Sequence, residues 1–376
     1  MPDTSANPPT TSSSIQASPT IPLLDLSAGV VWRQERDAHL NSAQAAPRDV
    51  IALSADLSQA LHEVGVIYIS GHGVSRAIQR DIERSARMFF SSPSSNKRSI
   101  EMKRAGRAWR GYFAEGAELT AGLPDYKEGL YFGEEHAPTH PLVRRSAPMH
   151  GANQWPQAPQ RLRPDVLAYC REMKRVATLL IELISLGLGL SADALLRRFT
   201  CVGTQEPTQL FRIFHYPRHS WSTRDDKWGV RAHTDMGFLT VLLQDQEGGL
   251  QAQLRSGAWV DVPPKEDTFV VNIGDMLELW TWGYLRATLH RVKSPVSKGG
   301  EAGRLSFPYF FDPAWDAPLT RIDRSLLPAR STALDTQSGA AERWDGLDLG
   351  RLNAETTYGD FVWRKVSQVF PHLAQM

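Results

Sequence analysis

The short segment Arg231-Ala232-His233-Thr234-Asp235 carries an imidazole and a carboxylate two residues apart. In an extended chain such residues point to the same side, so His233 and Asp235 can reach one metal ion. Another histidine, His290, follows 55 residues after Asp235 within the apolar stretch ATLHRV. Two imidazoles and one carboxylate are the ligands of non-haem Fe(II) oxygenases, and zinc also accepts them. We therefore take these three residues as candidate metal ligands.

A second polar pair, Arg304 and Ser306, is also spaced two apart, at the start of the apolar run LSFPYFF. If this run forms a strand, the two side chains share one face. An arginine on a buried face is costly unless an anion meets it, and arginine grips a carboxylate through two hydrogen bonds while serine adds another. A His-x-Asp tripeptide or a lone arginine recurs by chance. Their combination favours a site for a metal ion and a carboxylate.

These candidate residues lie in a part of the chain that is typical of β-sheet proteins. After Gln209, short runs rich in β-branched and aromatic residues alternate with turn residues such as Gly248-Gly249. The runs occupy residues 210–214, 238–243, 249–254, 269–273 and 305–311. Many short strands with few helices predict a sandwich or a barrel, which would hold the candidate ligands on its inner faces.

The rest of the chain alternates between helical patterns and loops. Apolar residues recur at helical spacing and predict four helices, over residues 48–66, 75–90, 164–188 and 358–370. Strands are expected in IPLLDLS, which begins at Ile21, and in VIYIS at residues 66–70. Scattered glycine, proline and polar residues between residues 91 and 160 indicate long loops with irregular strands.

Composition also divides the chain into regions. Residues 1–20 are mostly proline, serine and threonine, which cannot bury enough surface to offset chain entropy, so we expect a disordered tail. Residues 21–160 are expected to form a helix and strand region packed on the core. Residues 161–376 are expected to form the β-rich domain with its flanking helices, and the two regions together one compact unit.

Charge and cysteine content exclude several classes of function. Lys plus Arg number 42 and Asp plus Glu 41, so the net charge of +1 gives no reason to expect a nucleic acid or a membrane surface as partner. Only two cysteines occur, Cys170 and Cys201, which excludes a disulfide framework. No apolar run approaches a membrane span and no signal peptide is recognisable. We expect a cytoplasmic protein, and the sequence does not indicate its oligomeric state.

Several motifs in order resemble the 2-oxoglutarate- and Fe(II)-dependent dioxygenases, in the branch that includes isopenicillin N synthase. The resemblance covers nearly the whole chain after the tail, and the ordered set is far more specific than any one motif. The matching segments are IPLLDLS, LHEVGVIYISGHGV, DYKEGLYFG, HPLVRR to NQWP, HTDMGFLTVLLQDQEGGLQ, WVDVPP, FVVNIGDMLELWT, LHRV and RLSFPYFFDP.

This resemblance implies a mainly β fold with flanking helices, built on a double-stranded β-helix, or jelly-roll, core. It implies that His233, Asp235 and His290 hold Fe(II), and that Arg304 and Ser306 clamp the distal carboxylate of the cosubstrate 2-oxoglutarate. Tyr216, in FHYP, matches a tyrosine that contacts the cosubstrate. O2 is the oxidant and ascorbate is expected to stimulate turnover. The reaction would be hydroxylation, desaturation or ring closure, coupled to decarboxylation of 2-oxoglutarate.

Two positions depart from the family pattern. Phe214 stands where many plant members have asparagine, so one cosubstrate contact is missing or is replaced, with Arg212 as the candidate replacement. Trp282 stands where asparagine often follows threonine, and it is a packing residue at a loop or a substrate contact. Two other functions therefore remain open: an oxidase of the same fold that does not use 2-oxoglutarate, and a binding protein without turnover.

The aromatic content favours a small, partly apolar organic substrate over a macromolecule. Aromatic residues belong to cores more often than to pocket walls, so each candidate for the substrate pocket is a separate expectation. The candidates are Tyr112, Tyr131, Phe132, Phe238, Trp282 and Phe311.

Overall fold

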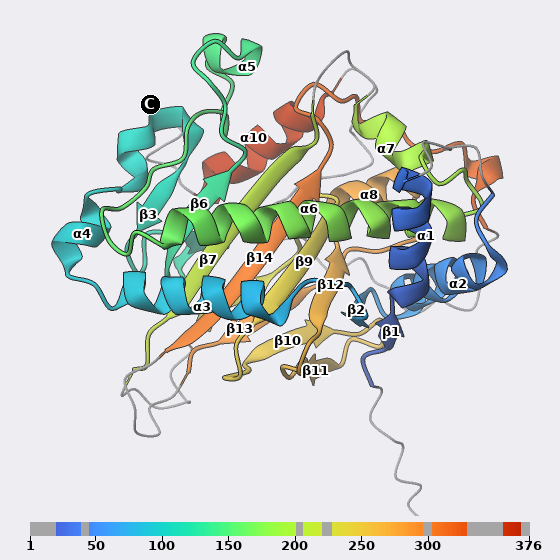
Figure 1. Cartoon of the computed structure of the whole chain (residues 1–376), viewed down its shortest axis with the longest axis horizontal. Helices are drawn as coiled ribbons and strands as arrows, with labels where there is room; N and C mark the ends of the chain where they lie inside the picture. The colour runs from blue at the N-terminus through green and yellow to red at the C-terminus, as the bar shows by residue number, and fades with distance from the viewer. Residues whose placement is uncertain are drawn as a thin grey trace, which may run out of the picture.

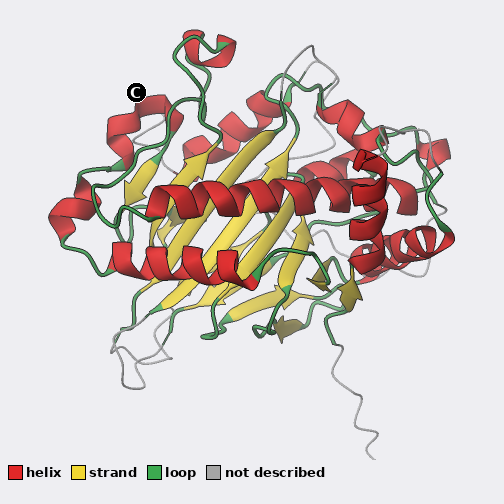
Figure 2. Ribbon diagram, in the orientation of Figure 1, coloured by secondary structure: helices red, strands yellow, loops and turns green. Residues whose placement is uncertain are grey.

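The computed structural model describes residues 20–38, 45–200, 206–219, 228–295, 303–328 and 356–369. The predicted disordered tail lies outside these residues, except for Thr20, and so does Cys201. Within the described residues, helices cover one face of a large twisted sheet, and a smaller sheet lies on its other side (Figure 1, Figure 2).

The large sheet has eight strands in the order β1-β2-β12-β9-β14-β7-β6-β3. Only β1 and β2 pair in parallel, while the other neighbours are antiparallel. The strands are β1 Leu23–Asp25, β2 Val66–Ser70, β3 Gly111–Phe113, β6 Glu128–Gly133, β7 Thr208–Tyr216, β9 Leu239–Gln244, β12 Phe269–Ile273 and β14 Arg304–Asp312.

A second, antiparallel sheet has four strands in the order β11-β10-β13-β8. They are β8 Trp228–His233, β10 Leu250–Gln253, β11 Trp259–Asp261 and β13 His290–Lys293. From β7 to β14 the chain crosses from one sheet to the other at every connection except β10 to β11. This alternation builds the predicted double-stranded β-helix, whose two sheets face each other across the molecule. A separate two-stranded ribbon pairs β4 Leu119–Thr120 with β5 Leu123–Pro124.

The helices pack outside this core. The long helix α6 crosses the face of the large sheet with α3 beside it, while α1 and α2 cover one end (Figure 1). Strand β7 is buried on both faces: Phe211 and Ile213 are buried on the helix side, where the Tyr169 ring of α6 is 5.1 Å from that of Phe211, and Leu210 and Phe214 are buried on the other face. The helices are α1 Ser27–Ala38, α2 Arg48–Glu63, α3 Arg76–Phe90, α4 Ser94–Arg98, α5 Pro141–Arg144, α6 Leu162–Gly187, α7 Ala194–Phe199, α8 Asp275–Trp280 and α10 Tyr358–Val369, with 3-10 helices η1 Met102–Ala108 and η2 Arg324–Leu326.

Most predicted elements agree with this structure to within a few residues. Helices α2, α3, α6 and α10 and strands β2 and β12 lie where the apolar spacing placed them. The α-helices that were not predicted in the described residues are α1, α4, α5, α7 and α8. Helix α1 follows the strand-like segment at Ile21 directly, and α8 begins at Asp275, shortly after the predicted strand at residues 269–273. No helix in the described residues is long and apolar enough to cross a membrane.

Candidate metal centre and cosubstrate site

Strands β8 and β13 of the small sheet bring the two candidate histidines together. His233 is the last residue of β8 and His290 the first of β13, and these residues are register partners. Their ring centroids are 4.3 Å apart. Each Nδ1 lies close to a backbone carbonyl oxygen two residues earlier, 2.8 Å from Arg231 O and 2.9 Å from Thr288 O. A proton on each Nδ1 leaves both Nε2 atoms with a free lone pair.

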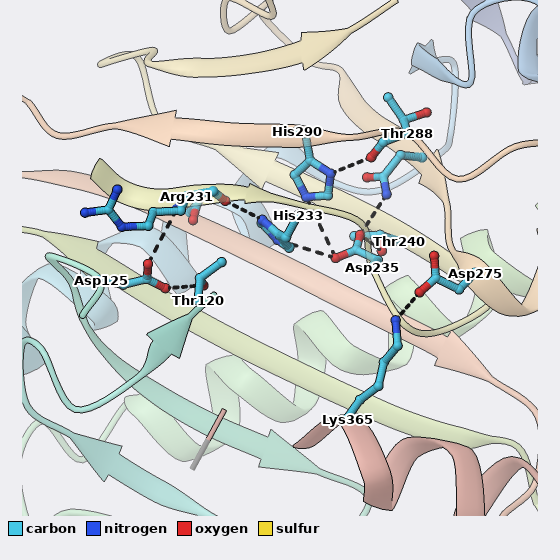
Figure 3. A network of polar contacts seen from close by, with 12 residues as sticks. Thr120, Asp125, Arg231, His233, Asp235, Thr240, Asp275, Thr288, His290 and Lys365 are labelled. Carbon is cyan, nitrogen blue, oxygen red and sulfur yellow. Dashed lines mark hydrogen bonds and ion pairs between the residues drawn. The ribbon is translucent and has the colours of Figure 1, made fainter. Parts of the chain in front are cut away.

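Asp235 lies just beyond the end of β8 and faces both imidazoles (Figure 3). Its Oδ1 is 3.9 Å from His233 Nε2 and 3.8 Å from His290 Nε2. Its Oδ2 accepts hydrogen bonds from the Thr240 hydroxyl of β9 at 2.5 Å and from the Asn272 amide of β12 at 2.7 Å. One carboxylate oxygen is therefore held by the large sheet, and the other points at the histidines.

The three residues fit a metal ion. One donor atom from each lies within 4.8 Å of the others, and among the described residues this is the single group of histidine, cysteine and acidic side chains with that property. Burial and the neighbouring His290 lower the pKa of His233 to about 4, which keeps its imidazole neutral and able to coordinate. Burial alone would raise the pKa of Asp235, but the two histidines and its hydrogen bonds hold it below its usual range.

A buried arginine stands at the other end of the same inner face. Arg304 is 1% exposed, and its guanidinium lies 4.8 Å from the centre of the Tyr216 ring. Its Nη2 donates a weak hydrogen bond to Gln244 at 3.3 Å, whereas Nε and Nη1 are buried without a partner among the described residues. The Ser306 hydroxyl donates to the Tyr216 hydroxyl at 3.5 Å. A buried cation with free donors is stabilised by an anion that accepts hydrogen bonds from it.

One cavity joins the two groups. It has about 1270 Å³ of free space, its open mouth included, and both the metal-ligand candidates and Arg304, Ser306 and Tyr216 line it. The metal-ligand candidates and the buried arginine therefore face one shared space that is open at its mouth.

Another wall of the cavity carries a network of buried charges. Lys127 lies between two carboxylates, with Nζ 2.9 Å from Glu118 Oε2 and 2.7 Å from Asp125 Oδ2. The Tyr131 hydroxyl donates to Glu118 at 2.5 Å, and the Thr120 hydroxyl donates to Asp125 at 2.8 Å. Although burial alone would lower it, the pKa of Lys127 stays above its usual range because of the two carboxylates. Both carboxylates therefore hold the ammonium group in place.

Comparison with known proteins identifies the family. Residues 207–313 match the 2OG-Fe(II) oxygenase superfamily, and residues 21–158 match the N-terminal region described as "non-haem dioxygenase in morphine synthesis". A probable iron/ascorbate oxidoreductase of Dictyostelium discoideum is 37% identical over 85% of this chain and 90% of its own length. The chain belongs to the 2OG-Fe(II) oxygenase superfamily. A 1-aminocyclopropane-1-carboxylate oxidase of the same organism is 31% identical over 88% of this chain and 94% of its own length.

Solved structures share the fold of this oxygenase. A putative 2OG-Fe(II) oxygenase family protein from Caulobacter crescentus superimposes with a TM-score of 0.68 at 22% identity, covering 94% of this chain and all of that one. A full-length Neurospora crassa protein in complex with alpha-KG and 5-formyluracil gives 0.66 at 23% identity, covering 95% of this chain and 96% of that one. The family resemblance, the jelly-roll fold, the enzyme class and the cofactors Fe(II) and 2-oxoglutarate are thus confirmed.

The six aromatic residues expected at the substrate pocket of the oxygenase do not line this cavity. Five are buried in the core, and Trp282 is 40% exposed. Tyr112 donates a hydrogen bond to Glu128, and Phe238 and Phe311 pack on Phe199. Tyr131 and Phe132 line a smaller neighbouring pocket.

Phe214 and Trp282, the two departures from the family pattern, lie in different parts of the structure. Phe214 lines the cavity, with the Lys127 ammonium 4.9 Å from its ring centre. Trp282 donates its indole N–H to Ile322 O at 2.7 Å and stacks with Arg321, whose guanidinium carbon lies 4.2 Å from the ring centre. Trp282 is therefore a packing residue that joins the loop after α8 to the segment near residue 322.

Some residues of the site were not found from the sequence. Thr240 and Asn272 are single polar residues inside the apolar runs FLTVLL and FVVNI, and this interruption was a usable signal. Lys127 and Glu118 lie in the region interpreted as irregular loops, where no periodicity shows which side chains turn inward. Lys365 of α10 also lines the cavity and forms an ion pair with Asp275 at the start of α8 (Figure 3).

Proposed function

We propose that His233, Asp235 and His290 hold the Fe(II) of this oxygenase. The observation that carries the proposal is the convergence of two Nε2 atoms and one carboxylate oxygen, each fixed from behind by a hydrogen bond to backbone or side chain. Such support fixes the orientation of the donors before the metal binds. Three ligands on one side leave the remaining positions for cosubstrate and O2.

We further propose that Arg304 and Ser306, with Tyr216, bind the distal carboxylate of 2-oxoglutarate. The unpartnered Nε and Nη1 of Arg304 support this role, because a carboxylate would supply both missing acceptors. Strand β14 carries Arg304 and Ser306 on one face, and Tyr216 is the register partner of Arg304 on β7. This end of the cavity therefore offers a cation and two hydroxyl groups to an incoming carboxylate.

Fe(II), 2-oxoglutarate and O2 together supply the oxidising chemistry, which yields succinate, CO2 and a substrate oxidised at a C–H bond by hydroxylation, desaturation or ring closure. The protein supplies geometry. The His233 imidazole stays neutral because its pKa is lowered, Asp235 stays ionised, and the clamp at Arg304 would hold the far end of the cosubstrate. The buried, largely apolar walls exclude water from the reacting groups. No side chain is required as a strong general acid or base.

The substrate is proposed to be a small organic molecule that enters the mouth of the cavity beside the metal. A net charge of +1 gives no reason to expect nucleic acid or an anionic membrane as partner, and a cytoplasmic location agrees with the sparse cysteine content. Ascorbate is expected to stimulate turnover by keeping the iron reduced.

A test combines Fe(II), ascorbate, 2-oxoglutarate and a panel of small organic compounds, and measures succinate release and product mass. We expect succinate formation that depends on 2-oxoglutarate, with Arg304→Gln raising the half-saturating concentration of 2-oxoglutarate by about ten-fold or more. Arg84→Gln, at an exposed position of α3, is the matched control and should behave as wild type. Turnover that is indifferent to 2-oxoglutarate would instead identify an oxidase of the same fold.

A further inference from the structure

A second arginine, Arg212, faces the cavity. Arg212 of β7 lines the cavity on the same strand face as Phe214 and Tyr216. Its Nε is buried without a partner, and no described residue accepts a hydrogen bond from its guanidinium. An arginine in this position is costly to bury unless an anion comes to it.

Aromatic rings hold this guanidinium in place. Its central carbon lies 4.2 Å from the ring centre of Tyr131 and 4.8 Å from that of Phe310. The nearby acid Glu118 accepts from the Tyr131 hydroxyl and pairs with Lys127, and it attracts Arg212 electrostatically without accepting a hydrogen bond from it. Lys127 also forms an ion pair with Asp125. On this wall of the cavity, the N–H donors of Arg212 therefore remain available to a ligand.

Strand register separates Arg212 from the cosubstrate clamp. Tyr216 is the register partner of Arg304, so Arg212 lies four residues away along β7, which is roughly 13 Å of strand. Phe310, beneath the guanidinium, is the partner of Thr240, whose hydroxyl binds Asp235. The guanidinium thus lies at the level of the metal ligands. If the cosubstrate reaches from the metal to Arg304, the guanidinium of Arg212 remains available to bind another anion.

We propose that Arg212 binds a carboxylate of the substrate, so that this oxygenase acts on small organic acids. The proposal rests on the proposed function, because it assumes that Arg304 holds 2-oxoglutarate. The acid group would form two parallel hydrogen bonds with the guanidinium. The apolar part of the molecule would lie along Leu210, Phe214 and Val230, which line the cavity beside Arg212. This contact would fix which C–H bond faces the metal.

The experiment compares carboxylic acids with their own primary amides, which keep the shape and lose the charge. The probes are phenylacetate, hexanoate and cyclohexanecarboxylate with phenylacetamide, hexanamide and cyclohexanecarboxamide. Each is added anaerobically to full-length protein loaded with Fe(II) and 2-oxoglutarate, and the rise in Tm is measured against concentration. Succinate release is then measured in air. The variants are Arg212→Gln, Arg212→Lys and, as a matched control outside the cavity, Arg84→Gln.

For wild type and Arg84→Gln we expect at least one acid to raise Tm and to stimulate succinate release more than its amide. For Arg212→Gln the half-maximal concentration of that acid should rise about ten-fold or more and the preference over the amide should vanish. Arg212→Lys should be intermediate, since it keeps the charge and loses the two-point contact. In Arg212→Gln the half-saturating concentration of 2-oxoglutarate should change by less than about two-fold, because Arg304 makes the contact with 2-oxoglutarate.

Four results would overturn the proposal: no acid acts, amides act as well as acids, the acid preference survives in Arg212→Gln, or Arg212→Gln weakens 2-oxoglutarate and acid alike. The last would assign Arg212 to the cosubstrate. Failure of the proposed function would look different, because wild type would then show no response to 2-oxoglutarate with any probe.

Discussion

Asp235 is the residue whose surroundings most clearly distinguish a metal ligand from an ordinary buried acid. A carboxylate that serves only packing would have both oxygens satisfied by nearby donors. Here Thr240 and Asn272 both bind Oδ2, while Oδ1 faces two imidazole Nε2 atoms at 3.8 and 3.9 Å. These separations are too long for hydrogen bonds. They suit atoms that share a metal ion.

Removing the support behind Asp235 should weaken the metal site without removing a ligand. We predict that Asn272→Ala lowers the affinity for Fe(II) by about 10- to 100-fold, because Asp235 loses one of the two hydrogen bonds that orient it. The measurement is an anaerobic Fe(II) titration with circular dichroism to verify folding. Asn96→Ala, which removes a side chain bonded to Ser92 and Ala158 outside the site, is the control. Equal Fe(II) affinity in both variants would contradict the prediction.

Asp312, at the end of β14, makes stability depend on pH. Burial, with the charge of Asp235, raises the pKa of Asp312 to about 7, although Phe238 N and the Tyr358 hydroxyl donate to it. In the unfolded chain the pKa is about 4. The folded state therefore binds this proton more tightly, and stability from this group falls as pH rises from about 4 to about 7. The loss is of the order of 4 kcal/mol and complete above about pH 7.

We predict that Asp312→Asn removes this part of the pH dependence, because the amide stays neutral at every pH. Urea unfolding of metal-free protein at about pH 5 and about pH 8 should show a smaller decline in stability for the variant than for wild type. Parallel declines in the two proteins would mean that Asp312 is ionised in the folded state throughout this range.

At the scale of elements, the close approach of α6 to α2 depends on one glycine. A Cβ added at Gly187 would lie 2.2 Å from the backbone oxygen of Ser54 and 2.7 Å from Ser58 Cβ. A backbone atom cannot move aside as a flexible side chain can. Because α6 also lies across the large sheet, a shift of this helix would disturb the scaffold of the site (Figure 1).

Gly187→Ala therefore tests packing against helix propensity. Propensity alone predicts a gain of up to about 1 kcal/mol, because alanine is the better helix former. The contact with Ser54 predicts a net loss of about 1–3 kcal/mol. Leu167→Ala, on the exposed side of α6, should cost less than about 1 kcal/mol. Stabilisation by Gly187→Ala in chemical unfolding would show that α2 and α6 are not so close in solution.

The sequence predicted those elements whose periodicity is long and regular. Helix α6 carries an apolar face over 26 residues, and β12 is a compact apolar run between turn residues. Helix α1 was missed because buried Val30 and Trp32 sit among polar residues without a clear stripe. The prediction that His233 and Asp235 point the same way assumed that both lie in one continuous strand. In the structure, β8 ends at His233, so Asp235 lies beyond the strand. Thr234 and Asp235 follow the strand in irregular backbone.

At the scale of the whole molecule, the packing of the strands determines which side chains line the cavity, and this could not be predicted from the sequence. Candidate ligands and a candidate clamp could be proposed from the sequence because metal and carboxylate binding restrict residue type. The pocket wall could not, because aromatic residues suit a core and a pocket equally well, and all six candidates lie outside the cavity lining. Charged wall residues such as Lys127 and Arg212 are brought inward only when β6 and β7 pair within the large sheet.

The most direct test of the metal centre measures 2-oxoglutarate consumption and Fe(II) content together in wild type and His290→Ala. We predict one Fe(II) per wild-type chain and succinate formed in equal amount to the 2-oxoglutarate consumed. His290→Ala should remain folded, lose most of its Fe(II) and form no succinate above background. A His290→Ala protein that retains Fe(II) and converts 2-oxoglutarate at the wild-type rate would contradict the assignment of this centre.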